Sequence, residues 1–252
     1  MSENHEFIGR PYSDDEKSIA SQALKKWAEE SREKLEGEGE KTAEEIAMLG
    51  AINEMLADEL KSLGIDEYDP ISADQVHILS EEVYHKNFPD TTDKAFYRAT
   101  SDAVYFDRDT ADTSARRLSN LMHESVHRAS RKKFYVDEKK GIYDARTGYR
   151  LRSPWKEDEE ENKLRGFNEL ITDYTVHKLF LRNAKMLEER FGITQADIHG
   201  SIYTYMDHGP ILAAITRKVA THRGSTPMEV FDTLERGLFT NTLLNLKDVE
   251  RV

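Results

Sequence analysis

The sequence contains no cysteine, which excludes both a disulfide framework and a thiolate metal ligand. No stretch approaches the roughly eighteen apolar residues of a membrane-spanning helix. The segment from Met1 to Pro11 also lacks the apolar core of a secretory signal. These absences predict cytoplasmic residence, with signal-independent secretion as the open alternative.

An excess of basic residues is also missing, since the formal net charge is −12. Binding to nucleic acid or to an anionic membrane requires clustered lysine and arginine, so neither is predicted as a partner. With 252 residues, of which 38% are hydrophobic and 33% charged, the chain can form one domain with an appended helical segment.

The most informative motif is H-E-x-x-H at residues 123–127. On an α-helix, residues four apart share a face, so His123 and His127 can direct one ring nitrogen each at a single zinc ion. Glu124 then lies beside a metal-bound water as a general base. The competing interpretation is an ordinary amphipathic helix that happens to carry two histidines.

A second motif, N-E-L-I-T-D at residues 168–173, supplies a carboxylate on a predicted helix. A catalytic zinc site uses three protein ligands and keeps its fourth position for water, so Glu169 is the candidate third ligand. The two motifs together favour a site for one Zn²⁺ per chain over the ordinary helix.

These residues resemble the gluzincin metallopeptidases, and within them the thermolysin-like pattern N-E-x-x-[ST]-D. The resemblance covers residues 93–180 and implies that Asp173 accepts the outer N–H of His123. It also implies that residues 95–98 and 104–107 form the hairpin before the metal helix, whose edge strand binds extended peptide. The segment between the second histidine and Glu169 is longer here than in that pattern. The resemblance therefore indicates the metal ligands of this chain better than its substrate preference.

Apolar residues recur at helical spacing in two N-terminal stretches, from Ile19 to Leu35 and from Ile46 to Leu63. We expect them to pair as a helical hairpin that serves as a scaffold, with a partner-binding coiled coil as the alternative. Short strands are predicted at 75–79, 94–99 and 103–107, followed by the metal helix after several N-cap residues in 109–114.

Residues 128–165 are the segment with the weakest pattern. A second hairpin is expected from 142–144 and 149–151, and the acidic run 157–161 favours a solvated insertion over a flap across the cleft. A helix over 168–190 is predicted to carry Glu169, and the chain beyond Gly192 also has a helical pattern. A donor for the oxyanion is expected from this last part, with four candidates: Tyr203, Tyr205, His208 and His222.

The patterns and the resemblance together predict an α+β fold with a zincin-like core. Residues 1–68 would form an N-terminal helical extension and residues 69–252 the catalytic domain, whose last part is mostly helical. The expected function is zinc-dependent hydrolysis of peptide bonds in a peptide or protein substrate, with Glu124 as base. The alternative is a non-catalytic zinc-stabilised interaction module, against which Glu124 argues because a closed structural site needs no base.

Overall fold

The computed structural model describes residues 5–8, 10–137, 141–151, 164–201 and 209–240, and within them the fold is α+β. Its elements are β1 (His5–Ile8), α1 (Asp14–Glu30), α2 (Ala43–Ser62), η1 (Ala73–Gln75), β2 (Val76–Leu79), α3 (Glu81–Asn87), β3 (Ala95–Arg98), β4 (Ala103–Asp107), η2 (Arg108–Thr110), α4 (Ser114–Ala129), β5 (Lys132–Asp137), β6 (Gly141–Thr147), β7 (Arg150–Leu151), α5 (Arg165–Arg182), α6 (Ala184–Phe191), α7 (Gln195–Ser201), α8 (Gly209–Arg223) and α9 (Pro227–Thr240). Each described helix is too short or too polar to cross a membrane.

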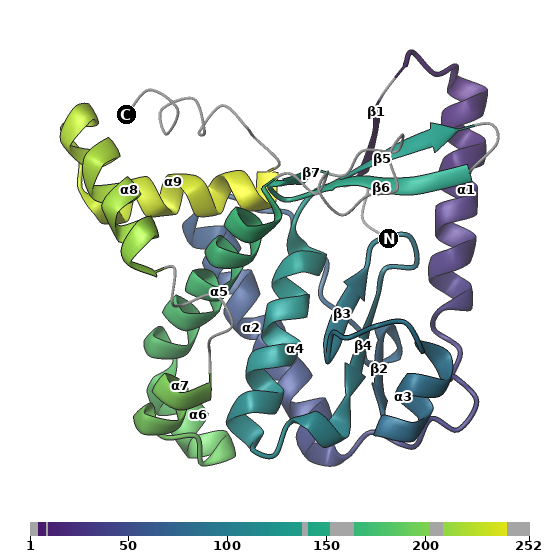
Figure 1. Cartoon of the computed structure of the whole chain (residues 1–252), viewed down its shortest axis with the longest axis horizontal. Coiled ribbons are helices and arrows are strands. Elements are labelled where there is room, and N and C mark those ends of the chain that lie inside the picture. The colour runs from purple at the N-terminus through teal and green to yellow at the C-terminus, as the bar shows by residue number, and fades with distance from the viewer. Residues whose placement is uncertain (1–4, 9, 138–140, 152–163, 202–208, 241–252) are drawn as a thin grey trace.

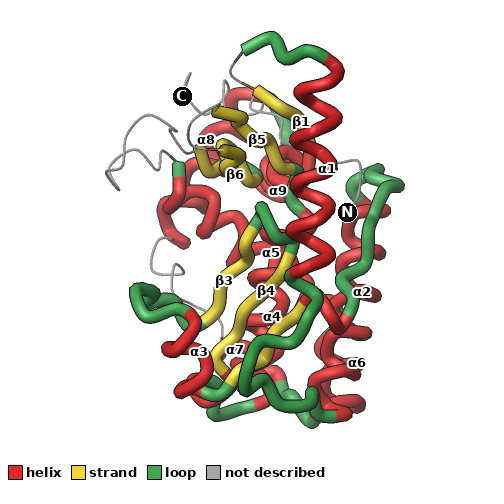
Figure 2. The backbone as a smooth tube through the Cα atoms, turned by 90° about the vertical axis from the view of Figure 1, so that its right-hand side faces the viewer, coloured by secondary structure: helices red, strands yellow, loops and turns green. Residues whose placement is uncertain are grey.

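The three strands predicted before the metal helix form one sheet in the order β2-β4-β3. β2 runs parallel to β4, while β3 and β4 form the expected antiparallel hairpin, in which Tyr97 pairs with Val104. All five residues of β4 are buried, as a central strand requires. β3 is therefore an edge strand, and Figure 2 shows it running beside β4.

The helix α4, which carries the H-E-x-x-H motif, packs between this sheet and two other helices, α2 and α5 (Figure 1). Its N-terminus is capped by Thr113, whose side chain accepts a hydrogen bond from the Arg116 N–H. The apolar residues that face the core are fully buried: Ala115, Leu118, Leu121, Met122 and Val126. They belong to one large cluster with residues of α2 and α5, which fixes the position of α4.

The predicted helical hairpin at the N-terminus is wrong. α2 buries residues from Met48 to Leu60 in the main core, against α4 and α5. α1 lies along the right-hand edge of the molecule in Figure 1, apart from α2, and its Leu24 packs with Ala99 and Phe134. The buried stripe of α1 is narrow, since Ile19 is 67% exposed, so it cannot form a helix–helix interface like that of α2. α2 shares its hydrophobic core with elements that follow residue 68. The division of the chain into an extension (1–68) and a catalytic domain (69–252) therefore stays a prediction from the sequence.

A second sheet, in the order β1-β5-β6-β7, lies above α4 and the first sheet (Figure 1). The expected hairpin of 142–144 with 149–151 is confirmed only in part. β6 and β7 do form a hairpin around Gly148, which has φ +55°, but residues 146 and 147 of β6 pair with β7, while residues 142–144 pair with β5. The sequence analysis missed β5, the main partner of β6, and β1, which pairs with β5 in parallel. The acidic run 157–161 falls outside the described residues.

The single helix predicted over 168–190 is two helices. α5 ends at Asn183, whose side-chain Nδ2 donates to the carbonyl of Leu179, and α6 begins at the next residue. Asn183 has φ −107° and ψ 13°, outside the α-helical region, so the chain changes direction there. Glu169 lies in the first half of α5, away from this break.

Candidate metal centre

α4 and α5 bring three predicted ligand atoms together. Nε2 of His123 lies 3.0 Å from Nε2 of His127, and each of these nitrogens lies 3.0 Å from Oε2 of Glu169. In the described part of the chain this is the group of three such side chains whose arrangement could hold a metal ion. Tetrahedral zinc with bonds of about 2.0–2.1 Å separates its ligand atoms by roughly 3.3 Å, so the observed spacing fits with a shift of a few tenths of an ångström.

The electrostatics of this group favour a positive charge at its centre. Burial disfavours a charged imidazole, but hydrogen bonds to Asp173 and Glu169 outweigh it and raise the pKa of His123 well above its ordinary value. Burial also opposes ionisation of Glu169, yet His127 and His123 hold its pKa well below the usual range. The three side chains therefore attract a cation, whether a proton or a metal ion.

Asp173 lies behind the group, on the same face of α5 as Glu169. Its Oδ1 is 2.8 Å from Nδ1 of His123, and the residue is 5% exposed. A proton on Nδ1 would be donated to Asp173 and would leave Nε2 as a lone-pair donor toward the group of three atoms. This is the geometry that the N-E-x-x-[ST]-D pattern implies.

The first turn of α5 is fastened by Asn168. Its Oδ1 accepts a 2.8 Å hydrogen bond from the Tyr149 N–H, in the turn between β6 and β7. Gly148 is required here, because a Cβ at this position would lie 2.6 Å from Asn168 Oδ1 and 2.6 Å from a Leu238 methyl. The second sheet thus sets where the helix that carries Glu169 begins.

Glu124 lies beside the three-atom group and is 8% exposed. Burial raises the pKa of its carboxyl, while the two histidines and a hydrogen bond from the Tyr97 main-chain N–H act in the opposite direction. Within the described residues it forms no salt bridge to lysine or arginine, and it lines a hollow next to the histidines. It is therefore placed to exchange a proton with a small molecule in that hollow.

The hollow has a volume of about 460 Å³, and we call it the inner hollow. One wall is β3, and the other contains Thr147, Arg150 and Arg165. A second, outer hollow of about 600 Å³ continues along β3 and shares Asp93, Phe96, Tyr97 and Arg150 with the first. The two hollows together follow the open edge of β3.

Three residues of these hollows were missed by the sequence analysis. Arg150 and Arg165 lie in or next to the segment with the weakest pattern, and no motif singles out Tyr97. Arg150 is on β7, so only the pairing of β6 with β7 could have indicated its place. Arg165 lies four residues before Glu169 on α5, and this helical spacing could have indicated its place. To predict that Tyr97 lies at the hollow, a rule that relates edge-strand residues to the H-E-x-x-H helix would have been needed.

The predicted oxyanion donors are not brought to the site by the described structure. Tyr203, Tyr205 and His208 fall outside the described residues. His222 is exposed in the last turn of α8 and does not line the inner hollow. Besides the two histidines, the side chains that line it with N–H groups are Lys94, Asn120, Arg150, Arg165 and Asn168.

Neither a protein-family model, nor a curated protein, nor a solved structure matches this chain.

Proposed function

We propose that the protein is a zinc-dependent metallopeptidase of gluzincin type, with His123, His127 and Glu169 as ligands. The observation that carries the proposal is the set of three ligand atoms 3.0 Å apart on the wall of an open hollow. Asp173 at His123 Nδ1 and Glu124 beside the group complete the arrangement that the resemblance implies. When bound, zinc would act as a Lewis acid and lower the pKa of a water ligand toward about 7.

The residues of the chain supply the remaining chemistry. Glu124 takes the proton of the attacking water and later delivers it to the leaving amine, for which a carboxylate with a raised pKa is suited. An extended peptide would lie along the open edge of β3, where main-chain hydrogen bonds are available. Arg150 and Arg165 line the same hollow and would donate hydrogen bonds to the developing negative charge on the carbonyl oxygen.

The second candidate is a zinc-stabilised interaction module without catalysis. A structural zinc site closes its fourth position with a protein ligand. Here the three-atom group borders a hollow of about 460 Å³, and the neighbouring acid, Glu124, makes no salt bridge to lysine or arginine in the described part of the chain. Both features favour the enzyme.

The test is to measure zinc content and peptide hydrolysis for wild type and for Glu124→Gln, which removes the base and keeps the ligands. We expect about one zinc per chain in both, and a loss of turnover on a peptide library of roughly 10²–10⁴-fold in the variant. Glu188→Gln, at an exposed position on α6, is the matched control and should have wild-type activity. Equal turnover of wild type and Glu124→Gln would remove the assigned role, and full zinc content without any turnover would favour the module.

A further inference from the structure

α4 carries a second pair of functional positions, one residue after each histidine. Glu124 and Arg128 are four residues apart, so they share a helical face next to the one that holds His123 and His127. Both are buried, at 8% and 6% exposed, which is unusual for charged side chains. This second face is turned toward the hairpin of β3 and β4, where each of the two residues has a hydrogen-bond partner.

Tyr97 of the edge strand connects to both ends of this face. Its main-chain N–H donates to the carboxylate of Glu124. Its hydroxyl donates to Oδ1 of Asp102 at 2.8 Å, and its ring lies 5.0 Å from the Lys132 ammonium. Tyr97 also lines both the inner and the outer hollow, so its position affects the surface on which a substrate would lie.

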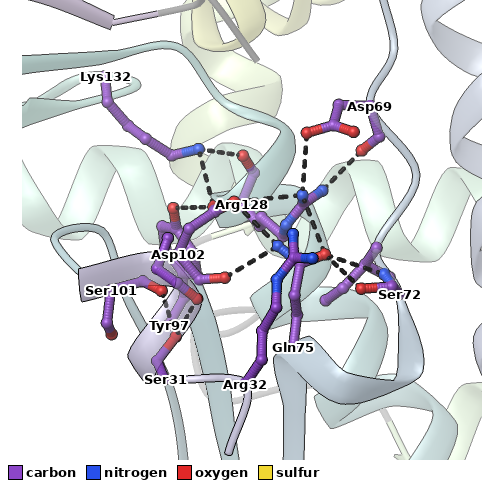
Figure 3. A network of polar contacts seen from close by, with 12 residues as sticks. Ser31, Arg32, Asp69, Ser72, Gln75, Tyr97, Ser101, Asp102, Arg128 and Lys132 are labelled. Carbon is purple, nitrogen blue, oxygen red and sulfur yellow. Dashed lines mark hydrogen bonds and ion pairs between the residues drawn. The ribbon is translucent and has the colours of Figure 1, made fainter. Parts of the chain in front are cut away.

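Asp102 is held in place from several sides. It is 4% exposed and has φ 48°, a left-handed conformation that few residues other than glycine, asparagine and aspartate adopt. Its Oδ2 accepts hydrogen bonds from Gln75 at 3.0 Å and from Arg128 at 3.3 Å (Figure 3). Burial opposes its ionisation, but Lys132 and Arg128 outweigh that and hold the pKa of Asp102 below its usual value. The side chain is therefore a buried, ionised anchor for the Tyr97 hydroxyl.

Arg128 joins this anchor to the rest of the molecule. Its guanidinium donates to the main-chain oxygen of Asp69 at 2.6 Å and reaches Gln75 Oε1 at 3.4 Å as well as Asp102 (Figure 3). The carbonyl oxygen of Arg128 accepts a 2.5 Å hydrogen bond from Lys132. The planar fork of arginine can serve these partners together, whereas a lysine ammonium could not.

We propose that Tyr97, Asp102 and Arg128 form a positioning relay that fixes the edge strand β3 against the general base Glu124. One end of the relay is the Tyr97 N–H on the Glu124 carboxylate, and the other is the Tyr97 hydroxyl on the Asp102–Arg128 pair. The two ends meet α4 one helical turn apart. Together they set the distance between β3 and α4 and the position of β3 along the helix axis. The relay holds the base and the substrate-binding strand in one geometry, and it rests on the proposed function.

The main test compares Tyr97→Phe with Tyr12→Phe. Tyr97→Phe removes only the hydroxyl and keeps the main-chain N–H and the ring. Tyr12 is the control, because its hydroxyl also makes hydrogen bonds, in this case with main-chain groups of Ile8 and Val136 away from α4, and its side chain is more buried than that of Tyr97. We expect kcat to fall roughly 10- to 100-fold in Tyr97→Phe with unchanged zinc content, and to stay at the wild-type value in Tyr12→Phe. Wild-type kcat in Tyr97→Phe, or an equal loss in both variants, would overturn the relay.

A double-mutant cycle with Asp102→Asn tests whether the residues act through one contact. Asparagine tolerates the left-handed conformation, so the substitution removes the charge with little backbone strain. If the relay is correct, the double variant loses no more activity than the more severe single variant. Multiplicative losses would show that the two residues act independently and would contradict it.

Amide hydrogen exchange of Tyr97 gives a readout that needs no turnover. In the zinc-loaded full chain, we expect Tyr97→Phe and Asp102→Asn to increase exchange of the residue 97 N–H by about 10-fold or more, while Tyr12→Phe leaves it unchanged. Unchanged exchange in both site variants would overturn the relay even if the protein hydrolyses peptides. Increased exchange in a protein without hydrolysis would support the relay and reject the proposed function instead.

Discussion

The two halves of α5 both bury acidic groups, but they compensate the negative charge differently. In the second half, Lys178 places its ammonium 2.9 Å from Glu59 of α2 and 3.0 Å from Asp232 of α9, and it also contacts Glu235 of α9. Glu59 and Glu235 are almost completely buried, at 1% and 0% exposed. Here the chain itself supplies the cation, and the result is a closed connection between three helices.

In the first half, Glu169 lies 3.0 Å from Nε2 of both His123 and His127, and Asp173 lies 2.8 Å from Nδ1 of His123. Imidazole carries a positive charge only when protonated, so the charge that compensates Glu169 is a proton on these rings or, under the proposed function, a metal ion. This half of α5 also borders the inner hollow. The acids around Lys178 are compensated by a cation of the chain, whereas Glu169, next to two imidazoles and a hollow, has the surroundings that the proposed metal site requires.

The largest effect is expected from removing the nitrogen donors. His123→Ala combined with His127→Ala should reduce the zinc content from about one ion per chain to nearly none, as measured by elemental analysis after dialysis. Lys178→Met, in the other half of α5, should keep its zinc. Stoichiometric zinc in the double histidine variant would show that the first half of α5 does not bind zinc together with these histidines.

Lys178→Met should in turn destabilise the fold strongly. Without the ammonium, the buried Glu235 loses its ion-pair partner and Glu59 keeps only the exposed guanidinium of Arg182. Loss of one partner of a buried ion pair costs about 3–5 kcal/mol. The free energy of unfolding in urea at pH 7 measures this. Lys185→Met, whose ion pair with Glu189 is exposed, should change the stability by less than about 0.5 kcal/mol. A similar small change in Lys178→Met would contradict the closed-connection interpretation.

The same half of the helix should make stability depend on pH. Burial, opposed in part by Lys178, raises the pKa of Glu235 from 4.5 to about 7. Between these values the unfolded chain ionises first, so stability falls as the pH rises from 4.5 and levels off above 7, by at most about 3 kcal/mol. Glu235→Gln should remove this decrease. Unfolding curves at several pH values test it, and parallel pH profiles of wild type and variant would argue against it.

The sequence was most informative where one element suffices to define the geometry. The i, i+4 spacing of His123 and His127 defines a helical face, and α4 and the β3–β4 hairpin are where the local patterns predicted them. The expected helical hairpin failed because residue spacing shows that α1 has an apolar stripe but not what covers it. Asn183 ended α5 early through its backbone conformation, which periodicity does not report.

The missed parts depend on contacts between distant segments. β1 pairs with β5 across more than a hundred residues, and no local pattern at residues 5–8 indicates such a partner. The same holds for Asp102 and Arg128, whose bond depends on how the β3–β4 turn meets the last turn of α4. The resemblance gave the position of Asp173 because it came as part of a motif, whereas Tyr97 belongs to no motif.

The smallest effect, and the sharpest test of the first half of α5, is expected for Asp173→Asn. The substitution keeps the size of the side chain but places a neutral amide 2.8 Å from His123 Nδ1, so the imidazole loses the carboxylate that fixes its tautomer and strengthens Nε2 as a ligand. Zinc affinity, measured by competition with a chromogenic chelator, should weaken roughly 10- to 100-fold with little change in unfolding free energy. Asp232→Asn is the matched control in the second half, since Asp232 pairs with Lys178 and is 44% exposed, and it should leave zinc affinity unchanged. Suppose instead that the zinc affinity of Asp173→Asn is within twofold of the wild-type value. The carboxylate behind His123 then stabilises the fold, as the acids around Lys178 do, and Glu169 is the one acid of α5 that distinguishes the first half as a metal site.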